Sequence, residues 1–447
     1  MVLIRKGAVC GMDRFVLKGK ICYSLSPQKM IAFEKGYAVC IDGKSRGVFE
    51  TLPQKYSDLP VIDFGDRLII PGLVDLHIHA PQYAFRGTGM DLELMDWLNQ
   101  QAFPEEAKYA DLTYAKKAYS IFAEQMKKSA TTRVCMFGTQ HRPATELLME
   151  LMEETGLVSF VGKVNMDREA PDNLREESAE ASVQATIAWI ESVSQKFQRT
   201  KPILTPRFIP SCTDELMQKL REIQMTYELP VQSHLSENQG EIAFVRELRP
   251  RNKFYGDAYE EHDLFGRNKE NHKEVKTIMA HCVWSEEEEV ELMRQNGVFV
   301  AHCPASNMNL SSGIAPIRSY LDKGLRVGLG SDVAGGHCES IFRAITDTVQ
   351  VSKMYWRLVD SSASPITFPE AFYLATKGGG AFFGKVGSFE EGYDFDAIVL
   401  EDAVLPYPQE LNVLQRLERA VYLSLDLNGI YAKFVEGRQL FSYKRLV

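Results

Sequence analysis

Two histidines separated by one residue, His77 and His79, are the first residues in the sequence with a clear capacity for chemistry. They end an apolar, β-branched segment that begins at Ile69, a pattern that predicts a buried strand. Side chains at positions i and i+2 of a strand point to the same face, so both imidazoles could bind one metal ion. A His-x-His pair alone is weak evidence, and such a site needs further ligands from other strands.

Polar residues also end three later segments with strand-like composition. These residues are His234, His281 and Asp332. Imidazole and carboxylate groups suit zinc, while iron(II) or manganese are less favoured alternatives. We therefore predict one zinc site per chain, with the ligands His77, His79, His234, His281 and Asp332. An open position on such a metal would hold a water whose pKa falls to roughly 7, which makes hydroxide available for hydrolysis.

Other titratable residues near these positions have less certain roles. Glu237 follows His234 by three residues and could move protons beside the metal, or it could be a solvated loop carboxylate. His302 ends the seventh predicted strand and could join the site or hydrogen-bond a loop. His141 follows the second predicted strand and could support the ligands or line the pocket. The sequence assigns neither histidine a single role.

The elements that must position these side chains alternate regularly from Leu68 onward. Strand candidates lie near 69–77, 132–137, 157–164, 202–206, 230–235, 276–283, 297–302 and 325–331. Helical patterns lie between them, including 112–128, 178–197, 214–228 and 286–296. Eight strands that alternate with helices over a region of this length predict an α/β fold, a (β/α)₈ TIM-type barrel. The active site of such a barrel lies at the carboxyl ends of the strands. All the candidate ligands follow strands in this way.

Short strand patterns with Gly, Pro and Asp between them occupy both ends of the chain. At the carboxyl end they include 396–400, 419–423, 430–435 and 439–441. We expect residues 1–67 and 389–447 to form one composite β-sandwich domain beside a barrel at 68–388.

Composition excludes several classes of function. The net charge of −9 argues against nucleic acid as a partner, because phosphate binding requires clustered Lys and Arg. We expect no membrane association, because no apolar run approaches the ~18 residues of a membrane span. The N-terminus lacks the apolar core of a signal peptide, and the 8 cysteines are scattered without a Cys-x-x-Cys pair. Together these features predict a cytoplasmic protein with reduced thiols.

The motifs resemble those of the amidohydrolase superfamily, and within it those of the enzymes that deaminate guanine. The general motifs are Pro71–His79, His234–Glu237, His281, Ser331–Asp332 and Glu391–Asp396. The more specific motifs are His79–Gln82, Asp96–Pro104, Gly162–Asp167, Thr205–Phe208 and His302–Asn307. The resemblance implies zinc-dependent hydrolysis of guanine to xanthine and ammonia in purine catabolism or salvage. Hydroxide would attack C2, with Glu237 and Asp332 as proton shuttles.

The resemblance also implies a set of residues that bind the purine ring. Gln82 can offer a donor and an acceptor to a ring edge, Arg207 can donate to O6, and Phe208 or Trp97 can stack on the base. His234 would contact the substrate as well as the metal. Members of this family are commonly homodimers, which we expect here too.

Some family members bridge two metals with a carboxylated lysine at the end of strand four. Here Lys163 lies on strand three, and strand four ends on Arg207 and Phe208, which favours a single metal. Two alternatives to guanine deamination remain. The scaffold could act on 8-oxoguanine, adenine derivatives, cytosine or triazines, or the chain could be a non-enzymatic interaction protein. Non-enzymatic relatives have typically lost metal ligands, whereas every ligand position is filled here.

Overall fold

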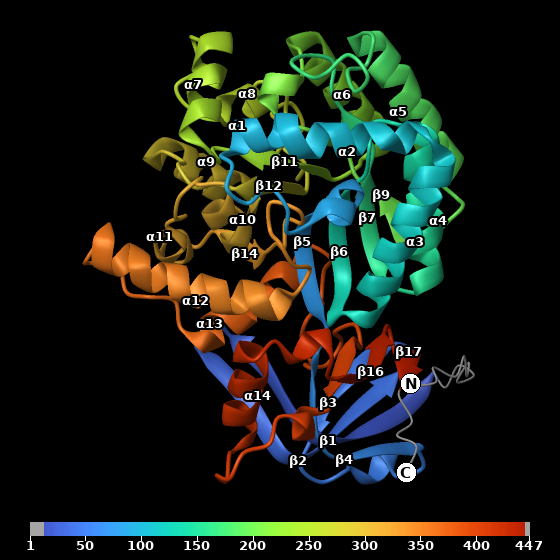
Figure 1. Cartoon of the computed structure of the whole chain (residues 1–447). Coiled ribbons are helices and arrows are strands. Elements are labelled where there is room, and N and C mark those ends of the chain that lie inside the picture. The colour runs from blue at the N-terminus through green and yellow to red at the C-terminus, as the bar shows by residue number, and fades with distance from the viewer. Residues whose placement is uncertain (1–12, 443–447) are drawn as a thin grey trace.

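Eight parallel strands surround the centre of the larger part of the molecule (Figure 1). The computed structural model describes residues 13–442. The strands form two four-stranded sheets, ordered β5-β6-β7-β9 and β11-β12-β13-β14. The first sheet contains β5 (Leu73–His79), β6 (Thr131–Phe137), β7 (Val158–Gly162) and β9 (Thr200–Pro202). The second contains β11 (Val231–Leu235), β12 (Thr277–His281), β13 (Phe299–His302) and β14 (Arg326–Leu329).

Backbone contacts connect the two sheets into a ring. A parallel bridge pairs Leu204 with Val231 beside the short strands β8 (Val164–Asn165) and β10 (Thr205–Pro206). On the other side the Asp332 amide donates to the His77 carbonyl at 2.8 Å, and the His79 amide donates to the Val333 carbonyl at 3.0 Å. The sequence therefore predicted the barrel strands correctly, with boundaries shifted by a few residues.

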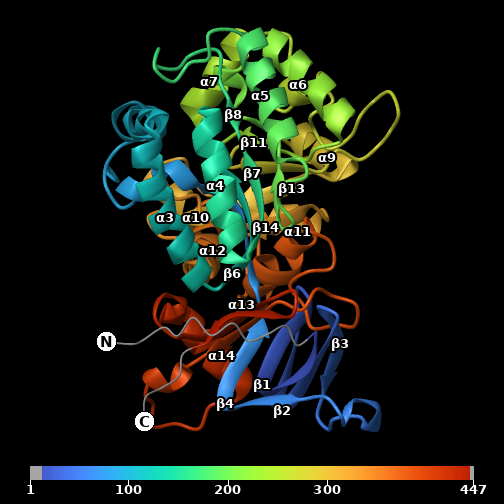
Figure 2. The same ribbon diagram turned by 90° about the vertical axis from the view of Figure 1, so that its right-hand side faces the viewer.

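Helices cover the outside of the ring (Figure 2). The longer ones are α3 (Leu112–Lys128), α4 (Arg142–Thr155), α5 (Ala179–Val193), α6 (Asp214–Tyr227), α7 (Gln239–Leu248), α9 (Glu287–Asn296) and α12 (Ile341–Leu358). The shorter ones are α1 (Leu94–Trp97), α2 (Phe103–Ala107), α8 (Asp257–Glu260), α10 (Pro304–Asn309), α11 (Ile317–Asp322) and α13 (Phe368–Tyr373). Side-chain N-caps start several of them; Asp111 accepts a hydrogen bond from the Thr113 amide at the start of α3.

The two chain ends meet in a seven-stranded sheet beside the barrel, where the blue and red ribbons lie together (Figures 1 and 2). Its order is β17-β16-β15-β4-β1-β2-β3. The bounds are β1 (Arg14–Ser26), β2 (Lys29–Ile41), β3 (Lys44–Phe49), β4 (Val61–Pro71), β15 (Ala397–Leu400), β16 (Ile430–Val435) and β17 (Arg438–Ser442). Aromatic side chains from both ends share its core, where the rings of Phe15 and Phe395 lie 5.5 Å apart.

One predicted strand in this region is wrong. Residues 419–422 belong to helix α14 (Val413–Tyr422) and Leu423 is its C-cap, so this segment is not a strand. A capping box starts the helix, because the Asn412 side chain accepts from the Gln415 amide and the Gln415 side chain accepts from the Asn412 amide. Its buried residues, including Leu417 and Val421, repeat every four positions. The short apolar run Ala420–Tyr422 concealed this helical spacing.

Gly72 marks the passage from the small sheet into the barrel. The segment that begins at Ile69 is two strands, since β4 ends at Pro71 and β5 starts at Leu73. A Cβ on Gly72 would lie 2.1 Å from Thr132 Oγ1, so only glycine fits between the two sheets. The predicted domain boundary between residues 67 and 68 falls inside β4, and the division into domains stays a prediction.

Other expectations concern membranes and cysteines. None of the helices within residues 13–442 is both long and apolar enough to cross a membrane. The cysteines in this part of the chain are free, and all but the partly exposed Cys338 are buried, as predicted. Cys10 lies outside the described residues.

Candidate metal centre and active site

The five predicted ligands come together at the carboxyl ends of the barrel strands. His77 Nε2 lies 3.2 Å from Asp332 Oδ1, and His79 Nε2 lies 3.4 Å from the same oxygen. His234 Nε2 is 3.2 Å from His79 Nε2, and His281 Nε2 is 3.6 Å from Asp332 Oδ2. Overlapping groups of these residues could each hold a metal ion. One face of β5 thus supplies two imidazoles, and three other strand ends supply the remaining groups.

Hydrogen bonds from outside the cluster orient two of the imidazoles. His234 Nδ1 lies 2.6 Å from the Arg207 carbonyl oxygen, and His281 Nδ1 lies 2.9 Å from Asn307 Oδ1. Both partner atoms are oxygens that accept, so each ring carries a proton on Nδ1 and turns its Nε2 atom into the cluster. Such partners fix the tautomer of histidines that bind metals.

The chemistry of this donor set fits a metal ion. His77 and His281 are buried, and their Nε2 atoms have no hydrogen-bond partner among the described residues. Burial lowers the pKa of His77, and lowers the pKa values of His79 and His234 well below the usual value, so these rings are neutral. Neutral imidazoles with free lone pairs around a carboxylate are metal ligands.

Glu237 lies beside the cluster without belonging to the ligand groups. Its Oε2 is 3.4 Å from His281 Nε2, and its Oε1 accepts a hydrogen bond from Ser312 Oγ at 3.0 Å. Burial raises the pKa of this carboxyl to about 7, although His281 opposes the shift. A group that titrates near neutral pH can both accept and donate a proton during a reaction.

The backbone takes unusual conformations where these strands end. Ser236, His281 and Asp332 have φ angles of 47°, 72° and 44°. Left-handed conformations are uncommon for residues other than glycine and cost free energy, so the surrounding contacts must hold them. Asp75 supplies one such contact, because its buried carboxylate accepts the His77 amide at 3.1 Å and the Ser331 amide at 3.0 Å.

A pocket opens directly above the cluster. Among its lining residues are the predicted ring-binding residues Gln82, Trp97, Arg207 and Phe208. Leu94, Leu98 and Leu310 complete its apolar wall. The pocket lining therefore combines apolar side chains with a few polar groups, including Glu237.

One buried residue that contacts the lining of this pocket, Glu106, was not predicted from the sequence. It lies on α2 and is buried, and its carboxylate contacts Arg207 and Gln82. The short motif Phe103–Pro104 drew attention to this region, but only the buried carboxylate two residues later holds the ring-binding side chains. Glu105 and Glu106 are adjacent on a short helix, and the sequence does not show which of the two contacts Arg207 and Gln82.

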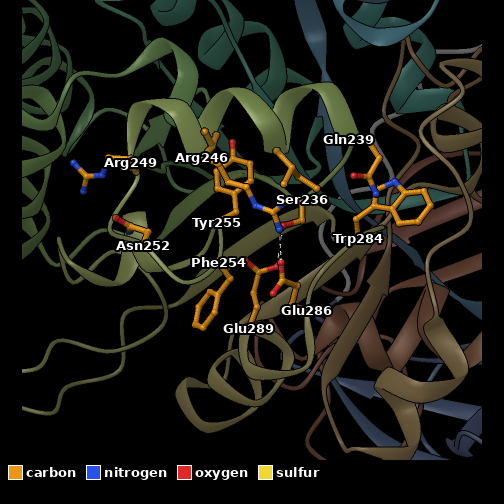
Figure 3. Close-up of a pocket in the computed structure, with 12 residues that line it drawn as sticks. Ser236, Gln239, Arg246, Arg249, Asn252, Phe254, Tyr255, Trp284, Glu286 and Glu289 are labelled. Atoms are coloured by element: carbon orange, nitrogen blue, oxygen red, sulfur yellow. Dashed lines mark hydrogen bonds and ion pairs between the residues drawn. The ribbon is translucent and has the colours of Figure 1, made fainter.

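An insert that follows α7, Leu248–Asn271, packs behind the active site. The Tyr259 hydroxyl donates to the His234 carbonyl at 2.8 Å, and the Tyr255 hydroxyl donates to Glu241 at 2.7 Å. Glu241 in turn accepts the backbone amide of Glu237 at 3.2 Å. A hollow on the outer side of this layer is lined by Ser236, Tyr255 and Glu289 (Figure 3). The insert thus supports the loop that carries Glu237.

Comparison with known proteins places the chain in a family. Residues 68–438 match the model of the Amidohydrolase family. The chain belongs to the amidohydrolase family. It is therefore a hydrolase that acts on carbon–nitrogen bonds.

Several relatives of this amidohydrolase share most of its length. Guanine deaminase of Dictyostelium discoideum is 37% identical over 388 residues, 85% of this chain and 84% of that protein. Guanine deaminase of Rattus norvegicus is 38% identical over 394 residues, with the same shares covered. Guanine deaminase from C. acetobutylicum, solved with guanine bound in its active site, is 45% identical with a TM-score of 0.91. That alignment covers 96% of this chain and 100% of the other, which confirms the predicted fold class.

The residues with open roles lie outside the ligand cluster of this amidohydrolase. His302 is buried, and burial lowers its pKa to about 3. His141 is partly exposed at the start of α4 and does not line the pocket. Lys163 forms an ion pair with Glu176 at 2.6 Å, so it does not extend toward the cluster. Cys303 lies near His281 and Asp332, but its thiol donates to the Ala301 carbonyl and burial raises its pKa well above the usual value.

Proposed function

We propose that this amidohydrolase is a guanine deaminase, which hydrolyses guanine to xanthine and ammonia. The observation that supports the proposal is one pocket whose lining includes Gln82, Arg207 and Glu237 together with residues of the His–Asp cluster. Relatives named guanine deaminase align over 85% of the chain, and one such structure holds guanine in its active site. A purine needs an apolar slot and a few fixed polar groups, which this pocket supplies.

We infer that the metal is zinc, one per subunit, with iron or manganese less favoured. His77, His79, His234, His281 and Asp332 would hold it. When bound, the metal supplies Lewis acidity that lowers the pKa of a water to roughly 7 and so provides the nucleophile.

The two carboxylates divide the proton transfers. Asp332 accepts the proton of the attacking water, since its oxygens lie within reach of His77, His79 and His281 at the centre of the cluster. Glu237 gives its proton to ring N3 as C2 is attacked. It then takes the proton of the C2 hydroxyl and passes it to the amino group, as the C2–N bond breaks and ammonia leaves. The proton held by Asp332 returns Glu237 to its acid form. The pKa of Glu237, raised by burial to about 7, suits both the acid and the base step.

The pocket residues hold the ring in place for this attack. Arg207 donates to the O6 carbonyl of guanine, which adenine lacks, and Gln82 pairs with the purine edge. Phe208 and Trp97 contact the flat face of the base, and His234 lies against it from the metal side. Phe208 is held edge-on to His234, with ring centroids 6.4 Å apart.

Ultraviolet monitoring of guanine conversion to xanthine tests the proposal directly. The purified protein should form xanthine and ammonia in a 1:1 ratio, and a chelator should abolish the reaction until zinc is restored. A panel of 8-oxoguanine, adenine, cytosine and a triazine separates guanine from the other aminated rings. Preferred turnover of any of these, or no turnover of guanine by the zinc-loaded protein, would refute the assignment.

Two further expectations belong to the same proposal. We expect a homodimer and a cytoplasmic location, and both stay predictions. Sedimentation of the purified protein would measure the first, and fractionation of cells that express it would measure the second.

A further inference from the structure

The ring-binding residues of the pocket share one buried carboxylate, that of Glu106. Its Oε2 lies 2.7 Å from Arg207 Nη1, and its Oε1 lies 3.1 Å from Arg207 Nη2. The same Oε1 accepts a hydrogen bond from Gln82 Nε2 at 2.8 Å. Glu106 is 2% exposed and Arg207 is 3% exposed, so water does not screen these contacts.

The contacts of Gln82 fix which end of its amide faces which neighbour. Its Nε2 donates to the Glu106 carboxylate, which can only accept, while its Oε1 accepts from the Ala334 amide at 3.1 Å, which can only donate. If the Gln82 amide were flipped, its NH₂ group would face the Ala334 amide and its oxygen would face the Glu106 carboxylate. Neither pair of groups could form a hydrogen bond. One N–H and one lone pair of Gln82 are left for a ligand, in a defined order along the ring edge.

The same carboxylate also balances the charge of Arg207. The fork-to-fork pair between Arg207 and Glu106 is buried and carries no net charge. The guanidinium also lies over the Phe103 ring, 5.1 Å from its centroid, which restricts its orientation further. The pocket therefore presents oriented donors to a neutral ring, instead of a free cation that would attract anions.

We propose that Glu106 is a positioning residue that sets substrate specificity, because it orients both Gln82 and Arg207 toward a 6-oxopurine edge. The inference rests on the proposed function and adds to it the origin of the selectivity. Glu106 itself is not among the residues that line the pocket, and it acts through its two neighbours.

Glu106→Gln is the test variant, and Glu105→Gln is the matched control. Glu105 lies next to it on α2 and is also buried, but its carboxylate pairs with Lys108 at 2.6 Å and with the Tyr114 hydroxyl, outside the pocket. A glutamine at 106 presents an NH₂ group that cannot accept from both neighbours. We expect kcat/KM for guanine to fall about 10- to 100-fold, as for misplaced binding groups generally, with little change for Glu105→Gln.

A ratio of affinities separates positioning from a general loss of structure. Hypoxanthine and unsubstituted purine share the ring system, but only hypoxanthine carries the 6-oxo group, and calorimetry gives their Kd values without turnover. The wild-type protein should prefer hypoxanthine, and Glu106→Gln should reduce that preference about tenfold. A structural defect alone would weaken both ligands equally.

Glu106→Asp provides a second variant in case the glutamine variant does not fold. It keeps the charge for Arg207, but its shorter side chain cannot reach Gln82 as well, so the preference should again fall. An unchanged hypoxanthine-to-purine ratio in a folded Glu106 variant overturns the inference, as does a wild-type protein without the preference. Failure of the proposed function gives a different result, which is a wild-type protein that does not convert guanine.

Discussion

At the scale of single residues, the proton-transfer role of Glu237 can be separated from metal binding. Glu237→Gln removes the titrating group but preserves shape, and the Ser312 hydroxyl can still donate to the amide oxygen. We expect metal content to stay at the wild-type level and kcat to fall about 10²- to 10⁴-fold, the usual contribution of general acid–base catalysis. Metal analysis and steady-state rates on guanine measure both effects. Near wild-type turnover would remove Glu237 from the reaction.

His234 should behave differently, because it is a predicted ligand. Its Nδ1 faces the Arg207 carbonyl and its Nε2 faces His79, so an alanine removes one of the inward lone pairs. We expect His234→Ala to lose metal together with activity. Elemental analysis after dialysis is the measurement, with His141→Ala as a control that should keep its metal. Full metal content in His234→Ala would exclude it from the ligand set.

The ligands could be predicted from sequence because each one follows a strand, and parallel strands bring their carboxyl ends together. Gln82 could be named because it lies three residues after His79 in a family motif, and Arg207 because the family motif Thr205–Phe208 ends a predicted strand. Glu106 could not be found in this way. It lies on a helix between the first two barrel strands, and only three-dimensional packing shows that it, and not Glu105, contacts both ring-binding residues.

At the scale of elements, the insert after α7 holds the loop that carries Glu237. Tyr255 donates to Glu241, and Glu241 accepts the backbone amide of Glu237. Tyr255→Phe leaves one Glu241 oxygen without its donor in a buried position. We expect a loss of about 1–3 kcal/mol in stability and a lower kcat with little change in KM, because the base no longer has one fixed position.

The matched control for this variant is Tyr227→Phe. Its exposed hydroxyl donates to Glu191 at 3.2 Å, between α6 and α5, and not to the Glu237 loop. Denaturant unfolding and guanine kinetics on both variants complete the comparison. Equal kinetic effects of the two substitutions would show that the insert does not support Glu237.

The errors in predicting elements have physical causes. Residues 419–423 read as a strand because four of the five are apolar or aromatic over a short run, while the capping box that starts α14 lies several residues upstream. Ile69–Leu76 was predicted to be one strand because the residues on both sides of Gly72 are apolar, and a single glycine does not mark the end of a strand. The reason for that glycine is the close approach of Thr132, which no local pattern reveals.

At the scale of the whole molecule, a buried ion pair ties the small sheet to the barrel. Arg133 on β6 donates through Nε to Asp396 Oδ2 at 2.6 Å and through Nη2 to Asp396 Oδ1 at 3.1 Å. Asp396 also accepts the Glu436 amide at 2.8 Å, so the pair is connected to the turn between β16 and β17. The sequence predicted that the two chain ends pack together, but it gave no sign of the charge that joins them to the barrel.

Breaking this pair should destabilise the molecule without altering the chemistry. Arg133→Met leaves the Asp396 carboxylate buried beside the barrel with its main partner gone, and such losses cost about 3–5 kcal/mol. Arg294→Met is the control, because the Arg294–Glu291 pair is 44% and 45% exposed and such pairs contribute about 0–1 kcal/mol. We expect Arg133→Met to lower the denaturant midpoint markedly while kcat of the folded fraction stays near wild type. Equal midpoints for the two variants would mean that the small sheet and the barrel do not depend on this contact.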